Sequence, residues 1–571
     1  MLASRVGFSV RAIMLWLSLS AMVAFTVGCT VISVHGENQA INKPLPIIAE
    51  SGILHIDVPR TQISPQWSTS PSFFGVALSG GGSRAANFSA AALQNLQEVG
   101  ILQEADAISS VSGGGLTGAY YALNAPNVQW DVLRSKLRTN FWGLFLSKWA
   151  APSNWPAIAL TDKTKTDVMA DVLDSVLFSG KEYREMPPVG PIFLANATDI
   201  TAGGKRVTFS NDYFVEELGS SLYNMRVATA VATSAAFPGI FDSVTVERFR
   251  RESLIDPRGG TYSWSPHSYV HLIDGGASDN LGVETLWDMA FSRLYGGVFT
   301  RMPTELGSKP CVIVSIDASA PNTSARFERL ADERGVSDRL FNRNVFDAID
   351  SLFEGRRQDT LTKMGLGQTD FGIVGSENFG DVQQNYVERQ RVGLFDIPVT
   401  CRPYFGAVRC SVDFSKPIPP AQRRSFQCFV WHIALDEVAG VAFKAKDFES
   451  GDSVREKFRR GSLVRLERLV TQIETHWKLV GPDGCTDQQL QEALYAAARV
   501  LIMDDVESRS SLCAYMGGKG MTVDDACRKE TPQTEVSISI TGKQPLAVSL
   551  ATDSSHTANL PVRCWAQDAS W

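Results

Sequence analysis

Three short apolar runs, each ending in a glycine-rich turn, constrain the fold of this chain more than any other feature. They are FFGVALSGGG at residues 73–82, AISSVSGGG at residues 107–115 and YVHLIDGG at residues 269–276. A short apolar run followed at once by glycines is typical of a buried strand that ends in a tight turn. The first two runs precede stretches with a helical pattern, so the sequence predicts strand, turn and helix in succession.

Further apolar runs continue this alternation of strands and helices. They predict strands at residues 191–199, 311–319 and 428–435. Strands that alternate with helices favour a mostly parallel sheet covered by helices on both faces, so the expected fold class is α/β. In such sheets, ligands bind beside the turns that follow the carboxyl ends of the strands.

The segments after residue 320 have a different character. Residues 326–395 are charged and mainly helical in pattern, and amphipathic helices are expected within 453–480 and 487–505. Beyond Cys513 the chain is polar and rich in Thr and Ser, with short strands expected in VSISITGK and LAVSLA.

Composition and charge exclude some classes of function. The 571 residues are 44% hydrophobic and 20% charged, which is typical of a globular protein with a large core. The net charge is −7, from 54 basic and 61 acidic residues, and there is no basic tract or zinc-like spacing of cysteine and histidine. Nucleic acid is therefore not expected as a partner.

The first 29 residues have the pattern of an export signal. Arg5 and Arg11 precede an uncharged apolar stretch that ends at Cys29. Its end, TVGC, resembles a bacterial lipobox, in which the cysteine becomes the lipid-carrying first residue, although Thr26 stands where leucine is usual. We expect an exported, membrane-anchored lipoprotein of the cell envelope, with a cleaved secretory signal or an uncleaved anchor as alternatives.

The nine cysteines fit an oxidising compartment. Two or three disulfides are expected in the C-terminal third, with Cys401–Cys410 and Cys513–Cys527 as the nearest pairs and at least one cysteine left over. Cys311 lies inside an apolar run and is expected to be a small buried thiol. The seven C-terminal cysteines are Cys401, Cys410, Cys428, Cys485, Cys513, Cys527 and Cys564.

The turn SGGGSRA at residues 79–85 can direct several backbone N–H groups to one point, because its glycines have no obstructing side chains. Such a turn suits an anion or a developing oxyanion. A dinucleotide-binding turn would need glycine at position 85, where this chain has Ala85. No metal or organic cofactor is expected.

The other two turns each offer a reactive side chain. Ser112 lies between small residues, as a nucleophile on a sharp strand-to-helix turn requires. Asp274 ends an apolar strand and is followed by two glycines, so its carboxylate can accept a proton from a nearby hydroxyl. Taken singly, the turn with Ser112 is more typical of a Gly/Ser-rich loop without chemistry, and the turn with Asp274 is more typical of an aspartate that caps a turn.

The order of the three turns resembles that of the patatin-like phospholipase family. The blocks NATDITAGGKRVTFSN at 196–211, VATAVATSAAFPGIF at 227–241 and DNLGV at 279–283 are also similar to blocks of that family. The resemblance covers residues 72–320 well and 425–505 loosely. It implies a three-layer α/β/α sandwich with a mostly parallel central sheet and a C-terminal accessory region.

The resemblance also implies a Ser-Asp dyad. Ser112 would attack an ester carbonyl and Asp274 would act as its base, without a histidine between them. The implied oxyanion-hole residues are Gly80, Gly81, Gly82 and Gly113. The implied supporting residues are Arg84, Gly114, Gly275 and Gly276. Ser110 and Ala85 stand where the family usually has glycine.

The implied activity is hydrolysis of acyl esters in phospholipids, lysophospholipids or related lipids at a membrane surface. A non-catalytic lipoprotein that uses the fold as a scaffold, and an acyltransferase with the same dyad, are the alternatives. A Ser-Asp-His triad could be drawn with His432, whereas His271 should point away from Asp274 because it lies three residues earlier in one strand.

Residues 140–160 are unusually rich in aromatic side chains, with Trp142, Phe145 and Trp149 among them. They predict either a core helix or a cap that contacts lipid, since tryptophan favours the headgroup boundary. The expected organisation is 1–29 export signal, 30–71 tether, 72–320 catalytic core, 321–510 extension that completes or packs on the core, and 511–571 accessory tail.

Overall fold

The computed structural model describes residues 40–44, 47–50, 53–56, 71–154, 163–188, 190–249, 269–303, 306–320, 343–366, 392–404, 407–414, 424–441, 454–482, 484–528, 535–538 and 548–551. The expected export signal, Cys29 and most of the tether expected at 30–71 lie outside these ranges. Among the helices within them, none has the length and hydrophobicity needed to cross a membrane.

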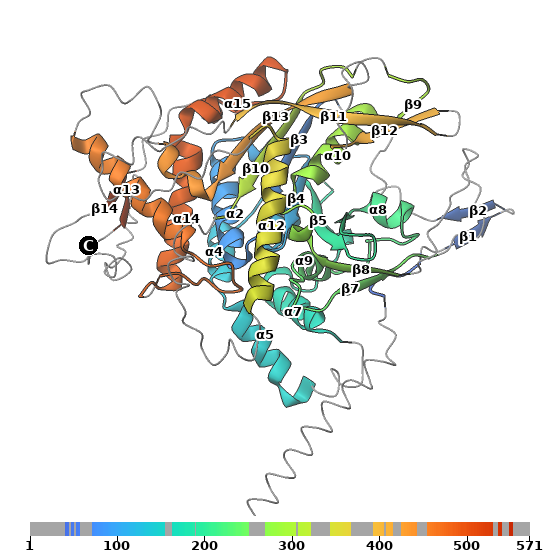
Figure 1. Ribbon diagram of the computed structural model, residues 1–571, viewed down its shortest axis with the longest axis horizontal. Helices are drawn as coiled ribbons and strands as arrows, with labels where there is room; N and C mark the ends of the chain where they lie inside the picture. Colours follow the sequence, from blue (N-terminus) through green and yellow to red (C-terminus); the bar gives the residue numbers. More distant parts are fainter. Residues whose placement is uncertain are drawn as a thin grey trace, which may run out of the picture.

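A sheet of eleven strands runs through the centre of the molecule (Figure 1). Its five central strands are parallel, in the order β5–β4–β3–β10–β13. All five coincide with apolar runs of the sequence, because a parallel strand buried on both faces carries apolar residues on both. Their bounds are β3 Phe73–Leu78, β4 Ala107–Val111, β5 Ile192–Asp199, β10 Cys311–Asp317 and β13 Arg424–Ala434.

Antiparallel strands flank this parallel centre on both sides. They are β6 Lys205–Phe209, β7 Val244–Glu247, β8 Tyr269–Asp274, β9 Val298–Phe299, β11 Val392–Tyr404 and β12 Ala407–Val412. The pairs β5–β6 and β11–β12 are antiparallel because their short connections cannot cross over the sheet. The sheet is therefore mixed, and the predicted parallel arrangement holds for its centre.

Helices cover both faces of the sheet, so the predicted three-layer α/β/α sandwich is confirmed. Side chains of β3 alternate between the two layers: Val76 packs with the α2 side and Ala77 with the α10 side. The first layer contains α2 Gly82–Glu98, α13 Val454–Thr471, α14 Asp487–Arg499 and α15 Val506–Gly518, and the second contains α10 Val283–Tyr295 and α12 Arg343–Lys363.

A further group of helices packs around β5, β6 and β8 and shares one apolar cluster with them. Figure 1 shows that α5 extends from this group toward the outside of the molecule. The group consists of α3 Gly113–Asn124, α4 Trp130–Leu137, α5 Phe141–Ala150, α7 Lys165–Leu173, α8 Asn211–Glu216 and α9 Val227–Ser234.

The segment expected as an extension contributes to the central sheet, because β13 lies between β10 and β11. Within the stretch predicted to be mainly helical, α12 is helical but β11 begins at Val392. The boundary expected at residue 511 falls inside the continuous helix α15. Two hairpins lie apart from the main sheet: β1 Ile47–Glu50 with β2 Ile53–Ile56, and β14 Glu535–Ile538 with β15 Val548–Ala551.

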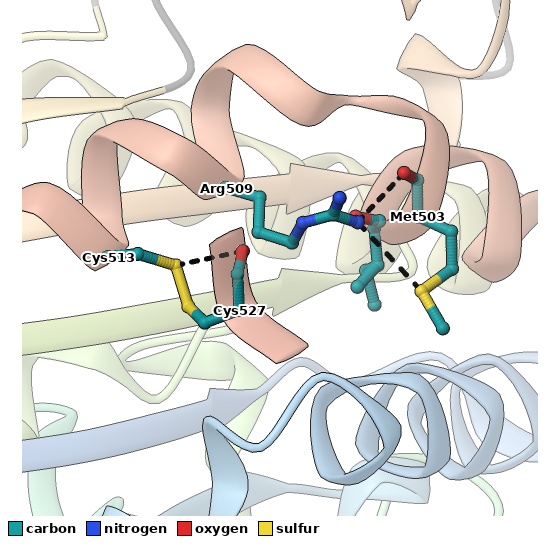
Figure 2. Close-up of a disulfide and its surroundings, with 5 residues drawn as sticks. Met503, Arg509, Cys513 and Cys527 are labelled. Atoms are coloured by element: carbon teal, nitrogen blue, oxygen red, sulfur yellow. Dashed lines mark hydrogen bonds between the residues drawn. A yellow bond between two sulfur atoms is a disulfide. The ribbon is translucent and has the colours of Figure 1, made fainter. Parts of the chain in front are cut away.

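Disulfides tie the C-terminal half together. Cys401–Cys410 and Cys513–Cys527 are bonded as predicted, and Cys485 is disulfide-bonded as well. Figure 2 shows that Cys513–Cys527 joins α15 to α16 (Asp525–Arg528) beside Arg509, whose guanidinium donates to the Met503 carbonyl over 2.8 Å.

The prediction for Cys311 is wrong, because Cys311 is bonded to Cys428. The two cysteines come from the neighbouring parallel strands β10 and β13, one residue before the paired positions Val312 and Phe429. Adjacent strands hold their Cα atoms 4.5 Å apart, which is a distance that a disulfide can bridge.

Candidate active site

Ser112 occupies a sharp turn between β4 and α3. Its backbone has φ 48° and ψ −120°, a conformation that is uncommon for a residue with a side chain and that concentrates at functional sites. The Ser112 N–H donates to the Ser234 hydroxyl of α9 over 3.0 Å, which fixes the turn. The side chain is largely enclosed, with 8% of the residue exposed.

Asp274 ends β8 and hydrogen bonds through its side chain with Ser112. The residue is 2% exposed, and its Oδ1 accepts a 2.8 Å hydrogen bond from the Gly276 N–H. Burial raises the pKa of Asp274 to about 7, although the hydrogen bonds from Gly276 and Ser112 act in the opposite direction. A carboxyl with this pKa can take up and return a proton near neutral pH.

The glycines of the first two turns allow two helices to meet at the serine. A Cβ added to Gly113 would lie 2.0 Å from the carbonyl oxygen of Gly82, so only glycine permits this approach. Gly82 begins α2 and Gly113 begins α3. The first N–H groups of a helix have no acceptor within it and carry the positive end of the helix dipole. The positive ends of two helices therefore meet beside Ser112.

Gly80 has a different role from the one expected. Its N–H donates to the carbonyl of Asn280 over 3.0 Å, so it is already engaged. A Cβ on Gly80 would lie 2.4 Å from Asn280 Oδ1, and one on Gly276 would lie 2.9 Å from the same atom. Asn280 thus joins the first glycine turn to the third, and Gly81, Gly82 and Gly113 remain as candidates for oxyanion donors.

A loop of the C-terminal extension holds the first turn. The expected supporting residue Arg84 donates from Nη1 to the Ile473 carbonyl over 2.6 Å and from Nη2 to Thr475 Oγ1 over 3.2 Å. The Ser83 N–H donates to the carbonyl of His476 over 2.7 Å. This loop was missed at the sequence level, because nothing in its own sequence indicates a contact with a helix about 390 residues earlier.

Asn196 supports the serine turn from the neighbouring strand β5. Its Nδ2 donates to Ser109 Oγ over 2.8 Å and to the Ser110 carbonyl over 3.0 Å. Ser109 in turn donates to the carbonyl of Gly282 over 2.6 Å, so its hydroxyl ties β4 to the start of α10. Ser110 is fully buried, and its small side chain fits where the family usually has glycine.

The remaining supporting glycines also sit at close contacts. A Cβ on Gly114 would lie 2.7 Å from the carbonyl oxygen of Ser79, and one on Gly275 would lie 2.3 Å from that of Asn196. These glycines let the second turn approach the first, and β8 approach β5.

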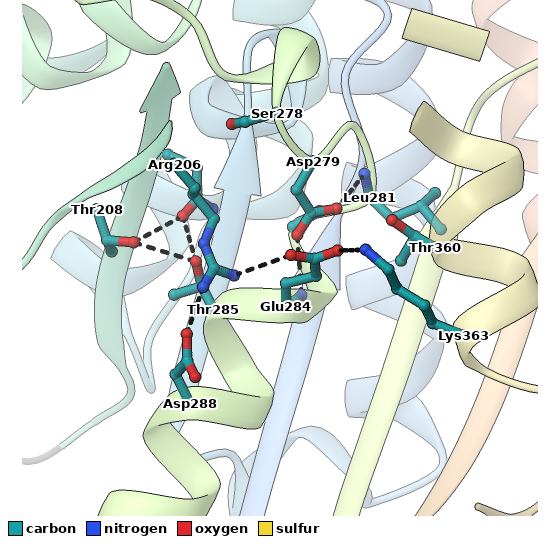
Figure 3. A network of polar contacts seen from close by, with 12 residues as sticks. Arg206, Thr208, Ser278, Asp279, Leu281, Glu284, Thr285, Asp288, Thr360 and Lys363 are labelled. Carbon is teal, nitrogen blue, oxygen red and sulfur yellow. Dashed lines mark hydrogen bonds and ion pairs between the residues drawn. The ribbon is translucent and has the colours of Figure 1, made fainter. Parts of the chain in front are cut away.

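Charged side chains fix the chain that follows Asp274 (Figure 3). The carboxylate of Asp279 accepts hydrogen bonds from the N–H groups of Leu281, Gly282 and Glu284, over 3.1, 3.0 and 2.8 Å. Burial raises the pKa of Asp279 to about 6. Lys363, at the end of α12, pairs with Glu284 over 2.6 Å.

Helix α12 packs against the turn that follows Asp274. The Phe353 ring lies against Gly276, where an added Cβ would be 2.7 Å from it, and stacks edge-on with Phe237 at 5.5 Å. Arg357 of the same helix is buried and donates from Nε to Asp317 Oδ2 at the end of β10 over 2.6 Å. This ion pair anchors the helix that covers the third turn.

Neither histidine considered as a third catalytic member contacts Asp274. His432 Nδ1 lies 3.3 Å from Ser315 Oγ and its Nε2 lies 3.6 Å from Asp317 Oδ2. It belongs to β13, which β3 and β10 separate from the serine strand β4. His271 Nδ1 hydrogen bonds with Thr245 Oγ1 at 3.0 Å. Within the described ranges, no group of His, Cys, Asp and Glu is arranged to hold a metal ion.

The comparisons with known proteins identify the domain that carries this site. Residues 76–287 match the model of the family described as patatin-like phospholipase, and the match includes Ser112 and Asp274. These residues form a patatin-like phospholipase domain. A search of curated proteins found no match.

Solved structures similar to the chain that contains this patatin-like domain include human GIVD cytosolic phospholipase A2, at 13% identity and a TM-score of 0.38. The match covers 80% of this chain and 62% of that one, so the chain spans less than two thirds of it. VipD from Legionella pneumophila is similar at 12% identity and a TM-score of 0.21, over 83% of this chain and 97% of that one.

Proposed function

We propose that this protein hydrolyses ester bonds of phospholipids, lysophospholipids or related acyl lipids through a dyad of Ser112 and Asp274. The observation that carries the proposal is the side-chain hydrogen bond between the strained Ser112 and the buried Asp274. A nucleophile within hydrogen-bond reach of its base is the arrangement that acyl transfer requires.

In the proposed reaction, Asp274 accepts the hydroxyl proton of Ser112 while Ser112 Oγ attacks the ester carbonyl. The tetrahedral intermediate collapses to an acyl-enzyme, and the leaving alcohol takes the proton from Asp274. A water molecule then gives a proton to Asp274 and attacks the acyl-enzyme. When the second tetrahedral intermediate collapses, Asp274 returns this proton to Ser112 Oγ and the fatty acid is released. One group serves as base and then as acid, for which a pKa of about 7 is suited.

The negative charge of each tetrahedral intermediate would be stabilised by the N–H groups of Gly81, Gly82 and Gly113. Two of these groups stand at the positive ends of α2 and α3. Donors that are fixed before the reaction begins need no reorganisation, and each contributes roughly 2.7–4 kcal/mol to the transition state in enzymes of this kind.

A fluorophosphonate probe tests the proposal, because it reacts covalently with activated serines. We expect the folded protein to be labelled on the peptide that contains Ser112, and Ser112→Ala to remain unlabelled. Ser110→Ala is the matched control, since Ser110 lies two residues away in β4 and the variant should keep the label. A folded wild-type protein that takes up no probe, or takes it up elsewhere, would contradict the dyad.

We further propose that the enzyme is exported and anchored by lipid on Cys29. The support is the TVGC pattern together with the disulfides Cys311–Cys428, Cys401–Cys410 and Cys513–Cys527, which form in oxidising compartments. In bacterial cells fed radiolabelled palmitate, the wild-type chain should incorporate label and Cys29→Ser should not. Equal labelling of the two proteins would rule out Cys29 as the anchor.

A further inference from the structure

Helix α5 has an unusual composition for a helix at the outside of a protein. Its sequence, FWGLFLSKWA, contains a single charged residue, Lys148, whose Nζ donates to the Asp171 carbonyl over 3.1 Å. A helix that is apolar nearly all round is normally buried in a core or in contact with lipid. The other apolar helices of this region, such as α9, are buried.

The apolar side chains of α5 are not all covered by protein. Phe141 and Phe145 face inward and are buried, whereas Leu144 is 38% exposed and Leu146 is 44% exposed. The other exposed positions are Ser147 and Ala150, so the outward face carries no charge. Figure 1 shows α5 projecting from the body of the molecule, which leaves this face accessible.

Two tryptophans lie at the border between the buried and the exposed face. Trp142 and Trp149 are partly buried and stack on either side of Phe145, with ring centroids 5.2 and 6.3 Å away. Tryptophan favours the headgroup boundary of a bilayer. Ten residues of helix span about 15 Å, half of the hydrocarbon thickness, so such a helix lies in the interface rather than across it.

The charge of the chain segment that contains α4 and α5 favours one type of lipid. Residues 130–150 contain four basic residues and one acidic residue, although the whole chain has a net charge of −7. Arg138, between α4 and α5, is exposed. A locally basic segment beside an uncharged apolar face complements a surface with anionic headgroups.

Helix α5 is connected to the site through the loop that holds the first glycine turn. The Trp142 N–H donates to the carbonyl of Trp477 over 3.3 Å, and the rings of Trp142 and His476 meet edge-on at 5.9 Å. The carbonyl of His476 accepts the hydrogen bond from Ser83 at the start of α2. A lipid surface in contact with α5 would therefore lie on the same side of the molecule as the loop that holds the first glycine turn.

We propose that the outward face of α5, formed by Leu144, Leu146, Ser147 and Ala150 with Trp142 and Trp149 at its edges, docks the enzyme on the surface of an anionic lipid bilayer. The idea that this docking brings the catalytic site to its lipid substrates rests on the proposed function. The docking itself depends only on the exposed apolar face and the basic segment beside it.

Cosedimentation with vesicles tests this proposal on the full chain carrying Cys29→Ser, which removes the proposed lipid anchor. This protein should bind vesicles that contain one third phosphatidylglycerol more tightly than vesicles of phosphatidylcholine alone. Leu146→Glu should bind the anionic vesicles roughly tenfold more weakly or worse. The substitution replaces an apolar side chain that would be buried in the bilayer with a negative charge. Leu394→Glu is the matched control, since Leu394 is 47% exposed on β11 and lies outside the proposed face.

Hydrolysis assays separate this proposal from the proposed function. Leu146→Glu should cleave a soluble short-chain ester at the wild-type rate but lose activity on the anionic vesicles. Binding and vesicle activity equal to those of wild type in Leu146→Glu would overturn the docking proposal. Leu146-dependent binding by a protein that hydrolyses neither substrate would overturn the proposed function and leave the docking surface in place.

Discussion

Asp274→Asn is expected to lower kcat for ester hydrolysis by roughly 10²- to 10⁴-fold, the range that a general base contributes. The amide keeps the shape of the carboxyl group but cannot accept the proton of Ser112. The loss should be near the upper end of the range, because neither His432 nor His271 is placed to act as base between the two residues. Steady-state kinetics on a soluble ester measure the loss, and circular dichroism checks the fold.

The pH profile of the wild-type enzyme supplies a second readout for Asp274. The carboxyl must be ionised to act as a base, and burial raises its pKa to about 7. The value of kcat/KM should therefore fall as the pH drops through about 7, and this decline should be absent from the residual rate of Asp274→Asn.

The matched control is His432→Gln, which should keep kcat within a factor of a few. His432 contacts Ser315 and Asp317, and two strands separate it from the strand that ends at the nucleophile. Loss of hydrolysis in folded His432→Gln, together with full activity in Asp274→Asn, would contradict the proposed Ser112–Asp274 mechanism.

Arg357→Ala is expected to cost about 3–5 kcal/mol of the free energy of unfolding, the usual effect of removing one partner from a buried ion pair. Arg357 is 1% exposed and Asp317 is fully buried, so the carboxylate would be left without its closest cation. Burial raises the pKa of Asp317, but the guanidinium of Arg357 acts in the opposite direction, and the pKa lies below its usual value. Denaturation by urea, followed through tryptophan fluorescence, measures the change.

Arg356→Ala is the control for this substitution. Arg356 precedes Arg357 on α12 and is exposed, and exposed substitutions usually change stability by about 0.5 kcal/mol or less. If the two variants unfold at the same urea concentration, the ion pair does not anchor α12. A lower rate in Arg357→Ala at a temperature where it remains folded would show that the anchor also positions Phe353 behind Gly276.

The sequence predicted the parallel centre of the fold well, for a physical reason. A strand that is buried on both faces needs mostly apolar or small residues, and β3, β4 and β10 each meet this need, β4 with two small buried serines. Ser112 and Asp274 could be singled out as candidates for a related reason. The backbone beside them is packed so closely that only glycine fits, as in the contact between Gly113 and Gly82, and the resulting glycines are visible in the sequence.

What the sequence could not predict depends on contacts between distant segments. The bond between Cys311 and Cys428 follows from the adjacency of β10 and β13, which neither strand specifies alone. The hydrogen bond from the Gly80 N–H to the Asn280 carbonyl could not be predicted either. The sequence of a glycine turn does not indicate whether its N–H groups already have acceptors within the protein. Nothing in the sequence of α12 indicated that Phe353 would lie against Gly276, in the turn that follows Asp274.

The loop that holds Arg84 has a consequence for the time at which activity arises during synthesis. Arg84 and its acceptor Ile473 are 389 residues apart, with both Ser112 and Asp274 between them. A nascent chain already contains its nucleophile and its base long before the residues that fasten the first glycine turn have been made. The protein is therefore expected to acquire hydrolytic competence late, only after the segment around Ile473 has left the ribosome.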